Sequence, residues 1–197
     1  MTFLSVILLV LCLVVCFVIF CVSIYFIIIT FSSGFMKHSP TIPTTGKTLS
    51  VMLQKTSEYI DTHSLNHSLN IIDAGCGWGT LLIPLARKYP SHHFIGIEYS
   101  FLPYILAKWR VRNLPNATII RQNLFTYPFH EADVILYFLL PSEMKRFSLK
   151  LKNEVKKTCF ICSNRFPLYQ ISYDEKIDLN DNFSCVYIYK TDGYNKF

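Results

Sequence analysis

Three glycines follow an aspartate in the segment Asp73–Gly79, which reads Asp-Ala-Gly-Cys-Gly-Trp-Gly. The segment comes directly after the apolar pair Ile71-Ile72 and leads into a stretch with helical spacing of apolar residues. Glycines at such a turn let the backbone bend tightly and let a ligand approach the main chain. These residue types in this order predict a ligand-binding turn between a strand and a helix.

The spacing of the glycines separates two classes of cofactor site. Dinucleotide enzymes need G-x-G-x-x-G, because a pyrophosphate rests on the helix N-terminus. Counted from Gly75, the third glycine of that pattern would be position 80, which is Thr80. The spacing here is instead D-x-G-x-G-x-G, and Glu98 closes the next apolar stretch, His93–Glu98.

This spacing, with an acid at the end of the second strand, resembles motif I of the class I S-adenosylmethionine-dependent methyltransferases. The resemblance implies that the glycine loop passes under the methionine part of the cofactor and that Glu98 accepts hydrogen bonds from both ribose hydroxyls. A carboxylate suits a vicinal diol because it offers acceptors to two donors. The residues expected to bind S-adenosyl-L-methionine are Asp73, Gly75, Gly77, Gly79 and Glu98.

Three further stretches narrow the resemblance. They are Pro43-Thr44-Thr45 followed by Met52-Leu53, then Leu136–Pro141, then Arg165-Phe166-Pro167. They resemble motifs of the small membrane-anchored protein-lysine methyltransferases, which modify the ATP synthase c-subunit and the adenine nucleotide translocase and have bacterial relatives. That family also carries a hydrophobic segment before its catalytic domain. The resemblance covers residues from about 43 to 170 and implies a lysine of a membrane-associated protein as the methyl acceptor.

Two positions depart from the family pattern. Thr45 replaces the second proline of the first motif, and Asn123 stands where the family usually has an aspartate after the third strand. An asparagine carbonyl can still accept a hydrogen bond from an adenine amino group, but without charge. Asn123 is therefore a candidate cofactor contact or a simple turn residue, and Thr44 is expected to cap the cofactor side.

The acceptor side of the site is expected at the loop after the fourth strand. Ligands bind at the carboxyl edge of a parallel sheet, and methyl transfer needs alignment of donor and acceptor with water excluded. An apolar channel also lowers the pKa of a lysine ammonium by desolvation. The candidate channel walls, each of which could instead be core packing, are Tyr137, Phe138, Pro141 and Phe166. No residue is identified as a general base.

Three functions follow as hypotheses. The principal one is a membrane-anchored methyltransferase that acts on a lysine of a membrane-associated protein. The second is a methyltransferase for a small molecule or lipid, which an anchor would serve equally well. The third is a non-catalytic S-adenosylmethionine-binding membrane protein.

The membrane prediction rests on an uneven distribution of charge. The chain has 197 residues and a net charge of +6, yet every Asp, Glu, Lys and Arg lies at or after Lys37. From Phe3 to Ile29 the polar side chains are Ser5 and Ser23, so the run can span a bilayer. A cleaved signal fits poorly, because the run is too long and no positive charge precedes it. Lys37, Lys47 and Lys55 then place the remainder on the cytoplasmic or matrix-equivalent side of a single-pass protein.

Metal and nucleic-acid binding are not expected. Cys159 and Cys162 form a CxxC, but on a strand residues three apart point to opposite faces, and no second pair completes a zinc set. A basic helix is expected near the C-terminus, with Lys145, Arg146, Lys150, Lys152, Lys156 and Lys157. Without interleaved aromatic residues it reads as a solvated face, or else as a contact for anionic lipid headgroups, rather than as a nucleic-acid site.

The elements that must position these residues alternate along the chain. Strands are predicted at Leu69–Asp73, His93–Glu98, Ala117–Arg121, Asp133–Phe138 and Thr158–Ser163. Helices are predicted at Gly46–Ile60, Thr80–Lys88, Phe101–Arg112 and Glu143–Val155. Such alternation indicates an α/β, Rossmann-like, doubly wound and mainly parallel sheet. Ile171–Asp178 and Ser184–Lys190 have no helix between them and predict a closing antiparallel hairpin.

These patterns define the expected domain organisation. Residues 1–31 form a transmembrane anchor and residues 32–45 a Ser/Pro/Thr-rich linker. Residues 46–197 form one methyltransferase domain, which is long enough for a single hydrophobic core.

Overall fold

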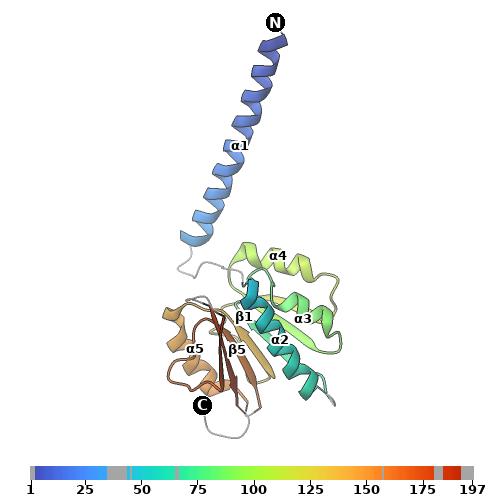
Figure 1. Ribbon diagram of the computed structural model, residues 1–197, viewed down its shortest axis with the longest axis vertical. Coiled ribbons are helices and arrows are strands. Elements are labelled where there is room, and N and C mark those ends of the chain that lie inside the picture. Colours follow the sequence, from blue (N-terminus) through green and yellow to red (C-terminus); the bar gives the residue numbers. More distant parts are fainter. Residues whose placement is uncertain are drawn as a thin grey trace. The chain divides into compact units, whose positions relative to one another are not determined.

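The computed structural model describes residues 3–34, 44, 46–64, 67–156, 158–179 and 184–191. The chain divides into two compact units, Met1–Pro40 and Thr41–Phe197. The first unit contains helix α1 (Phe3–Gly34), and the second contains a sheet with four helices (Figure 1). Most of the expected linker, 35–43 and Thr45, lies outside the described residues.

Helix α1 is apolar along its whole length. Its stretch Ser5–Ile28 has 24 residues and a mean hydropathy of 3.4, and none of its most apolar part is buried in the structure. By length and composition this helix can cross a membrane. A signal sequence can be equally apolar, so the helix alone does not establish membrane placement.

The second unit is a seven-stranded sheet in the order β3-β2-β1-β4-β5-β7-β6. Strands β1 to β5 are parallel, while β7 is antiparallel to both β5 and β6. This topology confirms the predicted Rossmann-like sheet with its C-terminal antiparallel pair. The elements are α2 (Gly46–His63), β1 (Asn70–Ala74), α3 (Leu82–Lys88), β2 (His93–Glu98), α4 (Phe101–Val111), β3 (Ala117–Arg121), β4 (Val134–Tyr137), α5 (Pro141–Glu154), β5 (Phe160–Asn164), β6 (Glu175–Asp178) and β7 (Cys185–Lys190).

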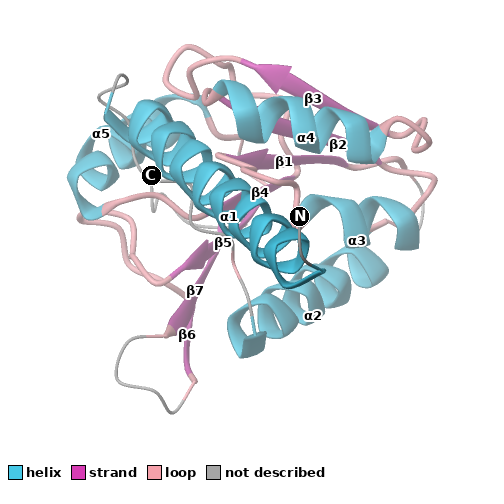
Figure 2. Cartoon of the chain, turned by 90° about the horizontal axis from the view of Figure 1, so that it is seen from above, coloured by secondary structure: helices cyan, strands magenta, loops and turns pink. Residues whose placement is uncertain are grey.

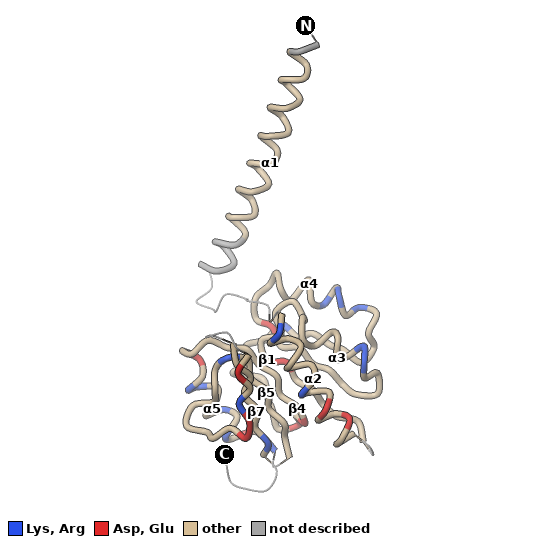
Figure 3. Tube along the Cα trace, in the orientation of Figure 1, with Lys and Arg blue, Asp and Glu red and all other residues tan. Residues whose placement is uncertain are grey.

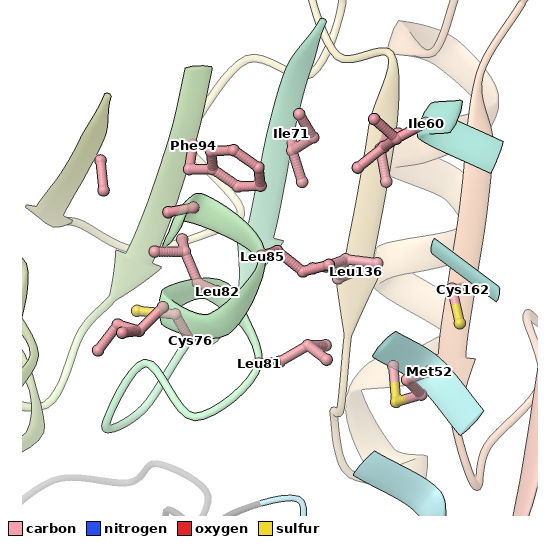
Figure 4. Packing of buried hydrophobic residues seen from close by; sticks show 14 of the residues in the cluster. Met52, Ile60, Ile71, Cys76, Leu81, Leu82, Leu85, Phe94, Leu136 and Cys162 are labelled. Atoms are coloured by element: carbon pink, nitrogen blue, oxygen red, sulfur yellow. The ribbon is translucent and has the colours of Figure 1, made fainter. Parts of the chain in front are cut away.

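Helices cover both faces of the sheet, which explains why the central strands are almost continuously apolar. Helices α2, α3 and α4 pack on one face, where Met52, Leu82 and Ala107 enter one buried cluster (Figure 4). Helix α5 packs on the other face through Phe147 and Leu151. Viewed from above, α2 and α3 lie on the opposite side of the strands from α5 (Figure 2).

The sequence placed most elements within two residues of their observed bounds, and the differences have local causes. Helix α3 begins at Leu82 rather than Thr80, because residues 77–81 form turns. Two of the three glycines with positive φ, Gly77 and Gly79, lie within these turns. Strand β6 begins at Glu175 rather than Ile171, because the segment before it follows the turn at Gln170, which has a φ of 57°.

A close approach in the middle of β2 packs the glycine loop against the sheet. Gly96 lies beside Cys76 and Ile119, and a Cβ built on Gly96 would lie 2.7 Å from Cys76 Sγ and 2.7 Å from Ile119 Cδ1. Cys76 is itself buried. Only a glycine at position 96 leaves room for the Cys76 side chain against the strand.

We expect Gly96→Ala to destabilise the protein by about 1–3 kcal/mol, the usual cost of overpacking a rigid core. The loss should appear as a melting temperature several degrees lower in thermal unfolding of the detergent-solubilised full chain.

Gly46→Ala is a matched control for this substitution. Gly46 has a φ of +61° and no atom within 4 Å of a built Cβ, so its replacement adds left-handed backbone strain without a clash. That strain costs about 1–2 kcal/mol. If Gly96→Ala melted at the wild-type temperature, the tight packing of Cys76 on β2 would be refuted.

Candidate functional site

The glycine loop lies at the carboxyl ends of the neighbouring parallel strands β1 and β2. Gly75, Gly77 and Gly79 have φ values of 82°, 53° and 72°, which L side chains rarely adopt. The N–H groups of Gly75 and Cys76 both donate to the Ile97 carbonyl, at 2.9 and 3.0 Å. The loop is therefore tied back to the end of β2 and cannot continue β1.

Glu98 connects this loop to the turn after β2. Its Oε2 accepts from the Gly77 N–H at 2.9 Å, and its Oε1 accepts from the Ser100 N–H at 2.7 Å. The carboxylate is only 6% exposed, so these charge-assisted bonds compensate for its burial. Each oxygen keeps a further lone pair for a ligand donor. The structure thus brings together the acid and the loop that the sequence identified.

Asp73 is the second buried carboxyl group of the site. Burial, followed by the nearby Glu98 charge, raises its pKa to about 7, although a hydrogen bond from the Leu82 backbone lowers it in part. The carboxyl group is therefore poised between its neutral and ionised forms near neutral pH. A cationic ligand group beside it would favour the ionised form.

Asn123 lies in the turn after β3, next to the carboxyl end of β2. Its Oδ1 accepts from the Phe125 N–H at 3.0 Å, and its carbonyl accepts from the Thr126 N–H at 3.0 Å. This is an Asx-type turn. The side-chain oxygen that would accept from adenine already stabilises this turn, an arrangement that fits the turn-residue alternative.

Thr44 is held by a residue that sequence reasoning missed. Asn164, the last residue of β5, is buried and donates from Nδ2 to Thr44 Oγ1 at 3.1 Å. The next residue, Arg165, has a φ of 69°, a strained conformation for a residue with a side chain. The sequence shows an asparagine directly before the Arg-Phe-Pro motif, but nothing in it indicates that Asn164 is buried or that Thr44 is its partner.

The expected acceptor walls gather at the carboxyl ends of the adjacent strands β4 and β5. The Phe138 and Phe166 rings stack with centroids 6.4 Å apart and an interplanar angle of 17°. Both side chains are half-buried, and Pro141 is the exposed first residue of α5. A Cβ on Gly75 would touch Leu139 Cδ2 at 3.4 Å, so the segment after β4 lies directly against the glycine loop.

Tyr137 lies deeper than the other three. Its side chain is 1% exposed and packs edge-on against Phe147, with ring centroids 5.1 Å apart. Its hydroxyl donates to the Phe166 carbonyl at 3.4 Å, and Ser163 Oγ donates to the same oxygen at 2.6 Å. Tyr137 therefore supports the position of Phe166 from inside the core.

No cluster of three or more His, Cys, Asp or Glu side chains suited to a metal ion occurs among the described residues. Cys159 and Cys162 pack into the hydrophobic clusters on opposite faces of the sheet, as their spacing predicted. Burial raises the pKa of both thiols, which keeps them protonated and poor metal ligands.

Comparison with known proteins now identifies the family. The model of the ANTKMT methyltransferase domain matches residues 73–175, just over half of the chain. The chain belongs to the ANTKMT methyltransferase family. The match begins at Asp73 and includes the glycine loop, Glu98 and the carboxyl ends of β4 and β5.

Relatives and solved structures agree with the family match. A protein-lysine N-methyltransferase of Saccharolobus islandicus is 26% identical over 161 residues, which cover 79% of this chain and 96% of that protein. A tRNA (guanine-N(7)-)-methyltransferase of Colletotrichum orbiculare is 27% identical over 55% of this chain and 42% of that protein. The fold resembles an RNA methyltransferase of Salinibacter ruber in complex with S-adenosyl-L-homocysteine, with a TM-score of 0.63, 19% identity and coverage of 78% of this chain and 95% of that one.

This member of the ANTKMT family is an S-adenosylmethionine-dependent methyltransferase. The residues present fit that cofactor. The loop has three glycines in the left-handed backbone conformation, which let a ligand approach the main chain. The Glu98 carboxylate, which contacts this loop at Gly77, can still accept hydrogen bonds from a ligand. Asp73, whose pKa of about 7 allows ionisation, adds a group that can face a cationic ligand.

The raised pKa of Asp73 makes the stability of the ligand-free protein depend on pH. Its pKa is 3.8 ordinarily and about 7 in the fold, so the folded state holds one more proton between these values. Stability from this group is therefore greatest below about pH 4 and is lost as the pH rises to about 7. We expect Asp73→Asn to gain stability relative to wild type across this range, measured as the difference in melting temperature at each pH.

Asp61→Asn provides the control, because the Asp61 side chain is 58% exposed. Its melting temperature relative to wild type should change little with pH. A pH-independent difference between Asp73→Asn and the wild type would contradict the raised pKa of Asp73.

Proposed function

We propose that this chain is a membrane-anchored methyltransferase that modifies a lysine of a membrane-associated protein. The observation that carries the proposal is the similarity to a protein-lysine N-methyltransferase across 96% of that protein's length. The apolar walls beside the glycine loop support it, because a lysine stem packs well against aromatic rings.

The proposed anchor is residues 1–31, followed by a linker at 32–45 and the catalytic domain at 46–197. Support for the anchor comes from the uncharged α1 and its mean hydropathy of 3.4. Support for a cytoplasmic or matrix-equivalent catalytic domain comes from Lys37, Lys47 and Lys55, which follow the apolar run.

We assign cofactor binding to the carboxyl ends of β1 and β2. Glu98 would accept from the ribose hydroxyls while its bonds to Gly77 and Ser100 hold the loop in place. Ionised Asp73 would favour the cationic portion of the ligand. The bound cofactor supplies a methyl group activated by its sulfonium. The proposed cofactor residues are Asp73, Gly75, Gly77, Gly79, Glu98, Asn123 and Thr44.

The acceptor lysine would enter between the carboxyl ends of β4 and β5. Phe138 and Phe166 would exclude water and desolvate the ammonium group, which lowers its pKa and favours the neutral nucleophile. Pro141 would form the outer rim, with Tyr137 supporting Phe166 from behind. Alignment and desolvation are then the contributions of the protein to the transfer.

The assignment of Glu98 predicts a large loss of cofactor affinity on substitution. Each of the two proposed ribose hydrogen bonds to the charged Glu98 is worth about 1.5–3 kcal/mol, so Glu98→Ala should weaken S-adenosylhomocysteine binding by about 100-fold or more. Isothermal titration calorimetry on the detergent-solubilised full chain measures this. Glu131→Ala, at a carboxylate side chain that is 79% exposed, is the matched control. Equal affinities for the two variants would refute the cofactor assignment.

The acceptor class is tested by following a radiolabelled methyl group. We expect full-length protein incubated with labelled cofactor and membranes to transfer label to protein, recovered as methyl-lysine after acid hydrolysis. Glu98→Ala should abolish the transfer and Glu131→Ala should retain it. Label confined to the organic-soluble fraction would instead identify a lipid or small-molecule acceptor, the second candidate, which the same apolar walls would accommodate.

A further inference from the structure

Helix α4 carries a second apolar face that the fold does not bury. Pro103, Ala107 and Val111 pack against the sheet. On the other side, large apolar side chains are open to solvent, with Phe101 53% and Trp109 60% exposed. We call this set the α4 apolar surface, and it consists of Phe101, Leu102, Ile105, Leu106 and Trp109.

These five residues form one continuous stripe along the helix. At 3.6 residues per turn they fall within an arc of about 140°. At the same spacing, Lys108 and Arg110 fall beyond opposite edges of this arc. Helix α4 contains no acidic residue, and the tube of α4 is coloured only for basic and uncharged residues (Figure 3). An exposed stripe of aromatic and aliphatic residues flanked by cations is typical of helices that lie in a membrane interface.

Cations also lie over the two exposed rings of the surface. The Arg112 guanidinium is 4.1 Å from the Trp109 ring centroid, and the Arg121 guanidinium is 5.0 Å from that of Phe101. Arginine beside an interfacial aromatic ring can keep its charge among lipid headgroups while the ring contacts acyl chains. The α4 apolar surface is therefore bordered by groups that suit anionic lipid.

The basic helix α5 offers a weaker lipid contact than the sequence suggested. Lys150 pairs with Glu154 at 2.6 Å, and Lys156 pairs with Asp133 at 2.5 Å. One cation of α5, Lys150, and one just after the helix, Lys156, are thus neutralised within the fold. Helix α4 instead combines cations with exposed apolar side chains on one surface.

We propose that the α4 apolar surface docks in the interface of an anionic lipid bilayer. The inference rests on the proposed anchor. Eleven residues separate α1 from α2, and an extended chain of that length reaches about 40 Å at most. A membrane that contains α1 is therefore always within reach of the domain, at a high effective concentration. The tether thus keeps a bilayer continuously available to the α4 apolar surface.

Docking would set the position of the catalytic site. The α4 apolar surface begins three residues after Glu98, and Arg110 Nη1 donates to the Trp78 carbonyl in the glycine loop at 2.6 Å. A bilayer that holds α4 would thus hold the carboxyl edge of the sheet close to the headgroups. The fixed height of the site would then select acceptor groups by their distance from the membrane surface.

The test uses the two tryptophans of the chain. Full-length protein with Trp78→Phe, reconstituted in phosphatidylcholine–phosphatidylglycerol vesicles, leaves Trp109 as the reporter. We expect its emission to shift to the blue and lipid with a spin label near the headgroup to quench it. The matched control, Trp78→Phe with Trp109→Phe and Leu149→Trp, places the reporter on α5 at a position that is 54% exposed. Trp109 should be quenched several-fold more strongly than this control.

Ile105→Glu with Leu106→Glu, added to the Trp109 reporter, should lower quenching to the control level. Retained S-adenosylhomocysteine binding would show that the domain is still folded. Equal quenching of Trp109 and the α5 reporter in vesicle-bound protein would overturn this inference while leaving the anchor intact. Protection of Trp109 only when a protein substrate is added would also overturn it. Failure of the chain to enter vesicles would overturn both the anchor and the docking surface.

Discussion

The buried carboxylate of Glu98 is the constraint on which the site depends. It accepts from Gly77 on one side and from Ser100 on the other, so one side chain fixes the glycine loop and the start of α4 together. Two charge-assisted bonds compensate for its burial, and an apolar residue at this position would leave both N–H groups without that partner. The shape of the loop and the position of α4 are therefore parts of one arrangement.

The order of the strands extends this arrangement to the ends of β4 and β5, where we propose that the acceptor enters. Because β1 lies between β2 and β4, the glycine loop is flanked by Glu98 on one side and by Leu139 on the other. The Phe138–Phe166 stack joins the segments that follow β4 and β5. There the Ser163 and Tyr137 hydroxyls both donate to the Phe166 carbonyl. A polar half and an apolar half of the site thus follow from the topology of one sheet.

The sequence predicted the sheet, and the places of the glycine loop and Glu98 within it, because the signals were local. Apolar runs marked the strands, and the D-x-G-x-G-x-G spacing with Glu98 marked the loop. The Asn164–Thr44 bond joins residues 120 positions apart, and no local pattern announces such a pair. The burial of Tyr137 and the exposure of Trp109 also depend on which neighbours the fold supplies.

The close packing of Gly96 against Cys76 has a chemical consequence for the cysteine thiol. Cys76 belongs to the glycine loop and is buried there. Packed against Gly96 and Ile119, the thiol is shielded, and burial raises its pKa well above the ordinary value. The thiolate that oxidants and electrophiles attack is therefore suppressed. The fold therefore keeps the Cys76 side chain in its protonated, poorly nucleophilic form.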